Sequence, residues 1–138
     1  MKNLTLVIGC GRLGASIADY VCSAGSSVAI LDQNKTSFDR LSSNYSGHKV
    51  VGNASDAQAL EDAGIEDSRE VIIATGNDNV NLYVAYLAAK IYEVPYVYVR
   101  FDDPDKGLLI QGLSVKAIYP FQLSLDRLAL LRAGVEEK

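Results

Sequence analysis

A short apolar strand that runs directly into a glycine-rich turn constrains this chain more than any other feature. Leu4–Ile8 is an apolar run containing β-branched residues, and Gly9–Gly14 (Gly-Cys-Gly-Arg-Leu-Gly) follows without a gap. An amphipathic stretch begins at Ala15. In such a strand–turn–helix, the first glycine allows the tight turn, the second lets the backbone approach a pyrophosphate, and the third lets the helix pack on the strand. The helix then points its free N–H groups at the phosphates.

A carboxylate at the end of the next strand strengthens this interpretation. The apolar run Val28–Leu31 ends at Asp32, eighteen residues after Gly14. A carboxylate in that place can accept hydrogen bonds from both hydroxyls of an adenosine ribose. Asp32 also favours a ribose without a 2′-phosphate, because the phosphate would meet a like charge; Lys35 is the nearby cation that would soften this repulsion. Plain turn glycines and a solvated or helix-capping Asp32 are the alternatives.

Strand-like and helix-like segments alternate along the whole chain. The predicted strands are 4–8, 28–31, 49–52, 71–74, 96–99 and 115–119, and the predicted helices are 12–24, 35–45, 56–63, 79–92, 103–111 and 121 to about 131–134. This pattern predicts a single α/β domain over 1–138, a Rossmann-like doubly wound parallel six-stranded sheet in the order 3-2-1-4-5-6 with helices on both faces. Ligands of such sheets bind at the carboxyl ends of the strands.

The residues at those strand ends are mostly small or polar, as a cradle of backbone groups requires. The predicted cofactor-binding residues are Gly9, Cys10, Gly11, Arg12, Leu13, Gly14, Asp32, Gln33, Asn53, Ala54, Ser55, Thr75, Gly76, Asn77 and Arg100. The guanidinium of Arg12 in the glycine turn can bind phosphate oxygens, and an exposed arginine on the first helical turn is the alternative. Arg100 fits either a phosphate contact or a subunit salt bridge. Thr75, Asn77 or Asp78 fits equally as a cap of the helix that follows.

Composition excludes several classes of function. At 138 residues, with 13 Lys and Arg against 17 Asp and Glu, the net charge is −4, which argues against nucleic acid as the partner. No apolar run approaches the roughly eighteen residues of a membrane span, and a strand follows the start directly, so we expect no signal peptide. Cys10 and Cys22 are expected to be reduced thiols. With His48 as the single histidine, no metal site is predicted.

Several motifs together resemble the nucleotide-binding regulatory domain of Trk/Ktr-type potassium uptake systems, also called the KTN or RCK N-terminal domain. They are Val7–Gly14, Gly52–Asp56, Leu60–Ile65, Ala74–Asp78 with Asn81, and Val99-Arg100. These motifs cover nearly the full chain in the order and spacing of the family.

The resemblance implies a cytoplasmic regulatory subunit, peripheral to the inner face of the cell membrane, that docks on a potassium transporter or channel. It implies binding of NAD(H) or ATP/ADP, no catalysis, and assembly into dimers or larger rings. The chain departs from the family at Asn53, where Gly-Asp is usual, and this leaves the ligand preference open. Many relatives continue into a C-terminal ligand-binding domain, so this chain is either a single-domain member or a fragment.

Two predicted helices are more apolar than one buried face requires. Residues 79–92 are apolar nearly all round, and the final helix carries six large apolar side chains within eleven residues. We expect both to form subunit interfaces in a homo-oligomer, the final helix as an inter-subunit crossover. An intramolecular core is the alternative.

The rival function is a small NAD-dependent oxidoreductase. Tyr86 and Lys90 share a helix face, as the acid–base pair of short-chain dehydrogenases does. The companion serine is missing from the expected upstream region, and the chain is too short for a substrate loop. A redox-sensing DNA-binding repressor would need a helix-turn-helix and a basic surface, and the sequence shows neither.

Overall fold

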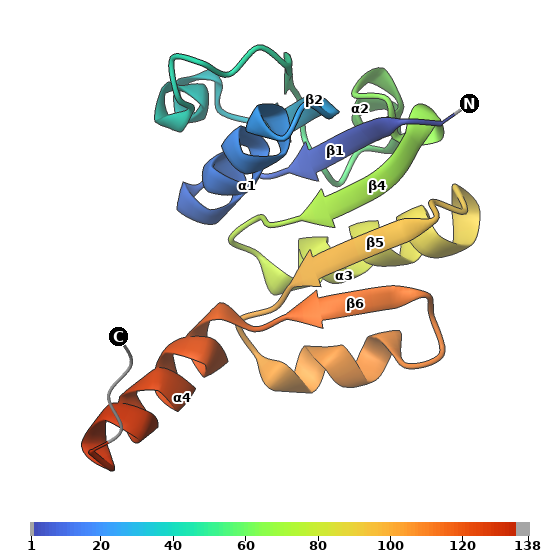
Figure 1. Cartoon of the computed structure of the whole chain (residues 1–138). Helices are drawn as coiled ribbons and strands as arrows, with labels where there is room; N and C mark the ends of the chain where they lie inside the picture. Colours follow the sequence, from blue (N-terminus) through green and yellow to red (C-terminus); the bar gives the residue numbers. More distant parts are fainter. Residues whose placement is uncertain (1, 135–138) are drawn as a thin grey trace.

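A parallel sheet with helices on both faces forms the body of the molecule. The computed structural model describes residues 2–134. The six strands lie in the order β3-β2-β1-β4-β5-β6, which confirms the predicted fold class and topology (Figure 1). The strands are β1 (Leu4–Ile8), β2 (Ser27–Asp32), β3 (His48–Val51), β4 (Ser68–Ile73), β5 (Tyr96–Arg100) and β6 (Val115–Ile118).

The connections between the strands are helical. They are α1 (Arg12–Ser23), the 3-10 helix η1 (Lys35–Arg40), α2 (Ala57–Asp62), the short 3-10 turn η2 (Ile65–Asp67), α3 (Asp78–Tyr86) with the π-helical turn η3 (Leu87–Ile91), the 3-10 helix η4 (Pro104–Ile110), and α4 (Pro120–Arg132) after the last strand. The predicted helix 79–92 is thus α3 continued by η3, where Tyr92 N donates to Leu87 O, five residues back.

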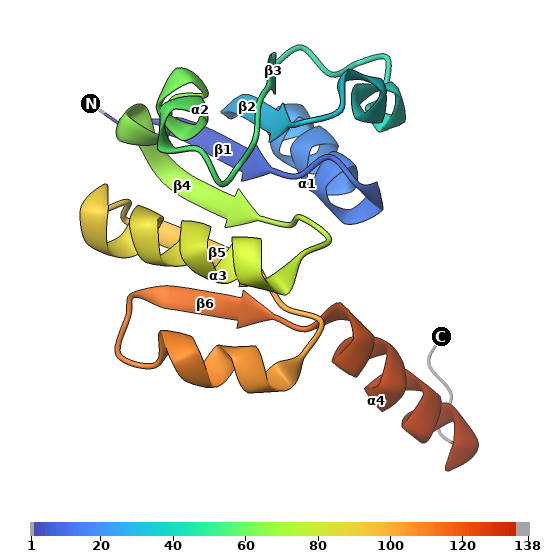
Figure 2. The same cartoon turned by 180° about the vertical axis from the view of Figure 1, so that it is seen from behind.

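Alternating side chains of the central strands supply two cores. On one face, Val7 and Ile30 pack under α1 and η1 with Ala18 and Phe38. On the other face, Leu6 and its neighbours pack under α2, α3 and η4 in a larger cluster. Successive residues of a strand point to opposite faces of the sheet, so each central strand contributes side chains to both cores. Figure 2 shows α2 and α3 on the face opposite to α1.

The register of β1, β2 and β4 aligns the carboxyl ends of these three strands. Ile8 at the end of β1 lies beside Leu31 of β2 and beside Ile73 of β4. The segments that follow these three residues therefore leave the sheet at one edge. Gly9, Asp32 and Ala74 come together there from distant parts of the sequence.

The predicted helix 35–45 is wrong beyond Arg40. The segment forms a single 3-10 helix and turns extended at Leu41, with φ −70° and ψ 146°. The next N–H group, that of Ser42, donates to both carboxylate oxygens of Asp19 on α1, each at 3.1 Å. A side chain from another element thus takes the donor that a continuing helix would use. The predicted helix 103–111 is also a 3-10 helix, Pro104–Ile110, capped by the Asp103 side chain.

The last helix leaves the body of the molecule. Figures 1 and 2 show α4 extending away from the edge of the sheet beyond β6. No residue of α4 is buried, and Phe121, Leu123 and Leu125 are 57–63% exposed. Within residues 2–134, the alternative of an intramolecular core for this helix is therefore not realised.

Candidate nucleotide-binding site

A cavity of about 490 Å³ opens at the carboxyl ends of the strands. Its walls come from the segments after β1, β2, β3 and β4, with Arg100 at the end of β5. Ten predicted site residues line it: Gly9, Gly11, Asp32, Gln33, Asn53, Ala54, Thr75, Gly76, Asn77 and Arg100. Five others, Cys10, Arg12, Leu13, Gly14 and Ser55, are not part of its lining. The cavity therefore lies at the edge of the sheet where a ligand was expected, and the predicted segments form its walls.

The three glycines of the turn meet three different surroundings. Gly9 has φ +98°, and a Cβ there would lie 2.8 Å from backbone atoms of Ala74 and Thr75. A Cβ on Gly14 would lie 1.8 Å from the carbonyl oxygen of Gly9. Gly11 has ordinary extended backbone and no atom within 4 Å of such a Cβ. The fold itself requires Gly9 and Gly14, whereas Gly11 leaves open space for a group from outside the chain.

Asp32 fastens the glycine turn to β2. Its Oδ2 accepts a hydrogen bond from Cys10 N and its Oδ1 one from Asn34 N, both at 2.8 Å. Each carboxylate oxygen has a further lone pair. The carboxylate can therefore accept ribose hydroxyls, as expected, while it holds the turn in place.

Cys10 packs beneath the turn instead of facing the cavity. Its side chain is fully buried, and its Sγ donates to Ser37 O at 3.3 Å. Burial, with the nearby Asp32 charge, raises the pKa of the Cys10 thiol to about 11. The protonated Cys10 thiol joins η1 to the turn through its hydrogen bond to Ser37 O. Both Cys10 and Cys22 are free thiols.

A buried asparagine joins the ends of β4 and β5. Asn81 on α3 is 0% exposed, and its Nδ2 donates to Thr75 O at 3.0 Å and to Arg100 O at 2.9 Å. Its Oδ1 accepts from the Thr75 N–H and hydroxyl groups. The sequence places Asn81 in a family motif without indicating this role, since its partners lie 6 and 19 residues away.

The segment after β4 serves both the cavity and the helix. The Asn77 side chain accepts from Asn79 N and Val80 N and so caps α3, as the capping alternative holds. Asn77 also lines the cavity. The Asp78 carboxylate accepts from Asp102 N and Asp103 N, each at 2.8 Å, and ties the start of α3 to the segment after β5.

Arg100 has a partner within its own chain. Its Nε and Nη2 both donate to Asp102 Oδ1 at 3.1 Å, and the two side chains are 21% and 34% exposed. This ion pair within the chain differs from both roles expected for Arg100, a phosphate contact and a subunit salt bridge. On the loop after β3, Asn53 Oδ1 accepts from Ser55 N at 2.8 Å, which shapes the turn that borders the cavity.

Sequence reasoning missed the wall that η1 contributes. Asn34, Ser37 and Arg40 line the cavity, whereas Lys35 and Arg12 do not. Arg40 Nη1 donates to Cys10 O at 3.5 Å. A polar and basic segment directly after Asp32 was the available signal, but none of these three residues was among the predicted site residues.

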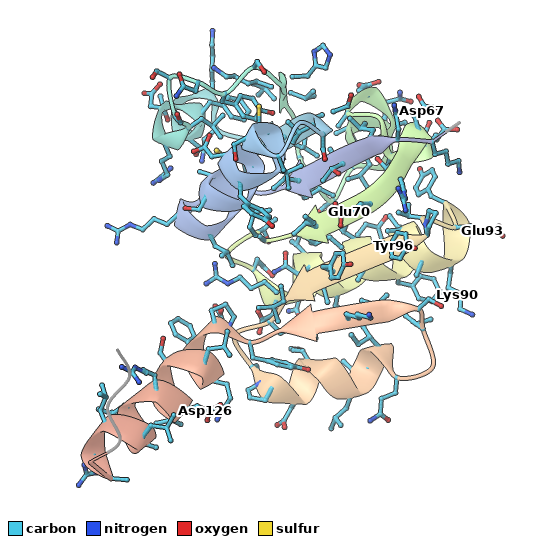
Figure 3. All side chains as sticks on the ribbon, in the orientation of Figure 1. Asp67, Glu70, Lys90, Glu93, Tyr96 and Asp126 are labelled. Atoms are coloured by element: carbon cyan, nitrogen blue, oxygen red, sulfur yellow. The ribbon has the colours of Figure 1, made fainter. Side chains whose placement is uncertain are left out.

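The rival catalytic pair lies elsewhere. Tyr86 and Lys90 are not among the lining residues. Figure 3 shows Lys90 at the edge of the sheet where the strands begin, opposite to the cavity. Among residues 2–134, no three His, Cys, Asp or Glu side chains cluster as metal ligands. No helix in this part of the chain is both long and apolar enough to cross a membrane.

Comparison with known sequences identifies relatives over nearly the whole chain. The family model of the TrkA-N domain matches residues 5–120. The Trk system potassium uptake protein TrkA of Streptomyces coelicolor is 32% identical over 133 residues, 95% of this chain and 60% of the relative. The TrkA homolog of Pyrococcus abyssi is 31% identical over 95% of this chain and 66% of the relative. The chain thus spans less than two thirds of the length of these relatives.

Solved structures share the fold. The TrkA-N domain of the inner membrane protein ybaL from Escherichia coli has a TM-score of 0.79 at 19% identity, covering 95% of this chain and 98% of that one. The GsuK channel bound to NAD has a TM-score of 0.76 at 20% identity, covering 94% of this chain and 23% of that one. Since the family model matches most of its length, this chain belongs to the TrkA-N domain family.

Proposed function

We propose that this chain is the nucleotide-sensing regulatory part of a potassium transport system and binds NAD(H) or ATP/ADP. The observation that carries the proposal is the open space at Gly11, which lines the same cavity as the Asp32 carboxylate that is bonded to the N–H of Cys10. The role in potassium transport is supported by its sequence relatives, which are named as Trk system potassium uptake proteins. Solved structures of GsuK, which share the fold, are bound to NAD and to ADP.

In the proposed complex, each part of the nucleotide meets one segment of the wall. The pyrophosphate lies on the Gly9–Gly14 turn, where the N-terminus of α1 supplies N–H groups and a positive dipole end. The adenosine ribose lies at Asp32. The far part of the ligand reaches Thr75–Asn77, where dinucleotides and adenine nucleotides differ.

That far segment suits the transmission of a signal. Thr75 is hydrogen-bonded to Asn81, which also holds the end of β5, so a contact at Thr75 is shared with β5 and the elements that follow. Two ligands that contact this segment differently would favour different subunit arrangements. Ligands with equal affinity for both arrangements would transmit nothing.

The proposed partners are other copies of this chain and a membrane protein. The six large apolar residues of α4 are 43–63% exposed, and Tyr83, Tyr86 and Ile91 on α3 and η3 are 45–61% exposed. Apolar surface of this extent is typical of protein interfaces. We place the assembly on the cytoplasmic side of the membrane, with α4 as the crossover between subunits, and assign it no catalytic activity.

Calorimetric titration of the chain with NAD⁺, NADH, ADP and ATP tests the binding proposal. Gly11→Val places a side chain in the space left for the phosphates, so we expect at least a tenfold loss of affinity. Ser16→Val is the matched control, because Ser16 is exposed on the helix that follows Gly11 and does not line the cavity. If none of these nucleotides binds the wild-type chain, or if Gly11→Val binds like Ser16→Val, the proposal is wrong.

Enzyme activity would overturn the regulatory assignment. Hydride transfer that survives purification and disappears in Tyr86→Phe would establish the rival oxidoreductase. We expect no turnover of the nicotinamide by the wild-type chain or by the variant.

A further inference from the structure

A second charged side chain lies beside Asp32 in space, although eight residues separate the two in sequence. Arg40 ends η1 and lines the cavity. Its Nη1 donates to the carbonyl oxygen of Cys10, and the N–H of the same Cys10 donates to Asp32. One residue of the glycine turn thus contacts a carboxylate on one side and a guanidinium on the other.

Arg40 is available to a ligand. Its 3.5 Å bond to Cys10 O is at the long limit of hydrogen bonding, and it is the single hydrogen bond of this side chain within residues 2–134. Asp32 is bonded to backbone N–H groups instead of to Arg40, and Arg100 on the opposite wall is paired with Asp102. The Arg40 guanidinium therefore retains most of its five donors.

Ser37 provides a second donor on the same wall. Residues three apart in a 3-10 helix lie on one face, so Ser37 and Arg40 are neighbours on η1. Both line the cavity. The contact between Cys10 Sγ and Ser37 O fixes this face of η1 against the glycine turn. A hydroxyl and a guanidinium are thus held together on the Asp32 side of the cavity.

We propose that Ser37 and Arg40 form a subsite for a phosphate on the 2′-position of the adenosine ribose, so that the site accepts NADP(H) as well as NAD(H). The inference rests on the proposed function, which places that ribose at Asp32. Asp32 alone would repel a 2′-phosphate. Charge-assisted bonds from the guanidinium offset that repulsion, while a ribose without the phosphate bonds directly to Asp32. Arg40, and not Lys35, is thus the cation that can compensate Asp32, because Arg40 lines the cavity and Lys35 does not.

Titration of the full chain with two matched ligand pairs tests the subsite. The pairs are NAD⁺ with NADP⁺, and 5′-AMP with 2′,5′-ADP, each differing by the 2′-phosphate alone. For the wild-type chain, we expect the Kd for NADP⁺ to lie within about tenfold of that for NAD⁺. Arg40→Gln should weaken NADP⁺ and 2′,5′-ADP by roughly tenfold or more and leave NAD⁺ and 5′-AMP within about twofold.

Lys35→Gln is the matched control, since it removes the same charge from the same helix at a position outside the cavity lining. It should leave all four affinities unchanged. If NAD⁺ binds and NADP⁺ does not, the subsite is refuted while the proposed function stands. The subsite is also refuted if Arg40→Gln weakens both members of each pair equally, because Arg40 would then serve the part that they share. If none of the four ligands binds, the subsite is refuted, and the titrations with NADH, ADP and ATP then decide whether the proposed function stands.

Discussion

The glycine turn and α4 differ in how many of their contacts lie within the chain itself. The turn is held by its own neighbours, with Gly14 against Gly9 and Cys10 bonded to Asp32. Helix α4 has helical hydrogen bonds but no buried residue and six large apolar side chains exposed. The chain itself therefore holds the turn in place, whereas no element within residues 2–134 buries the apolar side chains of α4. We therefore expect the glycine turn to bind the ligand and α4 to form contacts between subunits.

The largest effect is expected from Gly14→Ala. The new Cβ would overlap the carbonyl oxygen of Gly9, backbone that cannot move without opening the turn, so we expect a loss of about 3 kcal/mol or more in the free energy of unfolding. Urea denaturation measures it. Gly11→Ala is the control, because its methyl group meets no atom of the chain, and it should change stability by about 0.5 kcal/mol at most. Equal losses in both variants would contradict the distinction between the two glycines.

An intermediate effect on the free energy of unfolding is expected from ionisation of the Cys10 thiol at alkaline pH. Its pKa in the folded chain is about 11 against an ordinary 9.0, so folding favours the protonated thiol. The resulting stability is present below pH 9 and is lost as the pH rises through 11. Between pH 8 and 10.5, wild-type protein should lose about 2 kcal/mol more than Cys10→Ala, measured by urea denaturation.

Cys22→Ala is the control for this pH dependence. Hydrogen bonds with Ser46 lower the pKa of the Cys22 thiol, so the sign of its contribution is opposite. The Cys22→Ala protein should therefore keep the alkaline loss of the wild type. If Cys10→Ala keeps it too, burial of the Cys10 thiol is not its cause.

The smallest effect on the fold is expected from α4. Leu128→Gln changes a side chain that is 52% exposed, so the free energy of unfolding of the monomer should change by about 0.5 kcal/mol at most. The same substitution at the fully buried Leu60 should lower the free energy of unfolding by about 2 kcal/mol, because it buries an amide. Sedimentation should show an oligomer for the wild type at micromolar concentration and a shift toward monomer for Leu128→Gln. A clean wild-type monomer would refute the role of α4 in assembly.

Local patterns were sufficient to predict the fold and the centre of the cavity. The strand before Gly9, the helix after it and the acid at Asp32 are short-range signals, and the parallel topology follows from alternation and handedness. The segment after Asp32 was harder to predict. The sequence predicted a helix over 35–45, but Asp19 takes the Ser42 N–H and the helical segment ends at Arg40.

The sequence by itself determined which segments meet at the edge of the sheet, because strand order and glycine spacing are properties of the chain read in order. Only the tertiary structure decided which side chains reach the cavity. Arg12 and Lys35 carry the right charge close to the motif and do not line it, whereas Arg40 does. Likewise, Asn81 joins two strand ends that no local pattern relates. Charge and spacing are local, but the direction of a side chain depends on contacts made by distant parts of the chain.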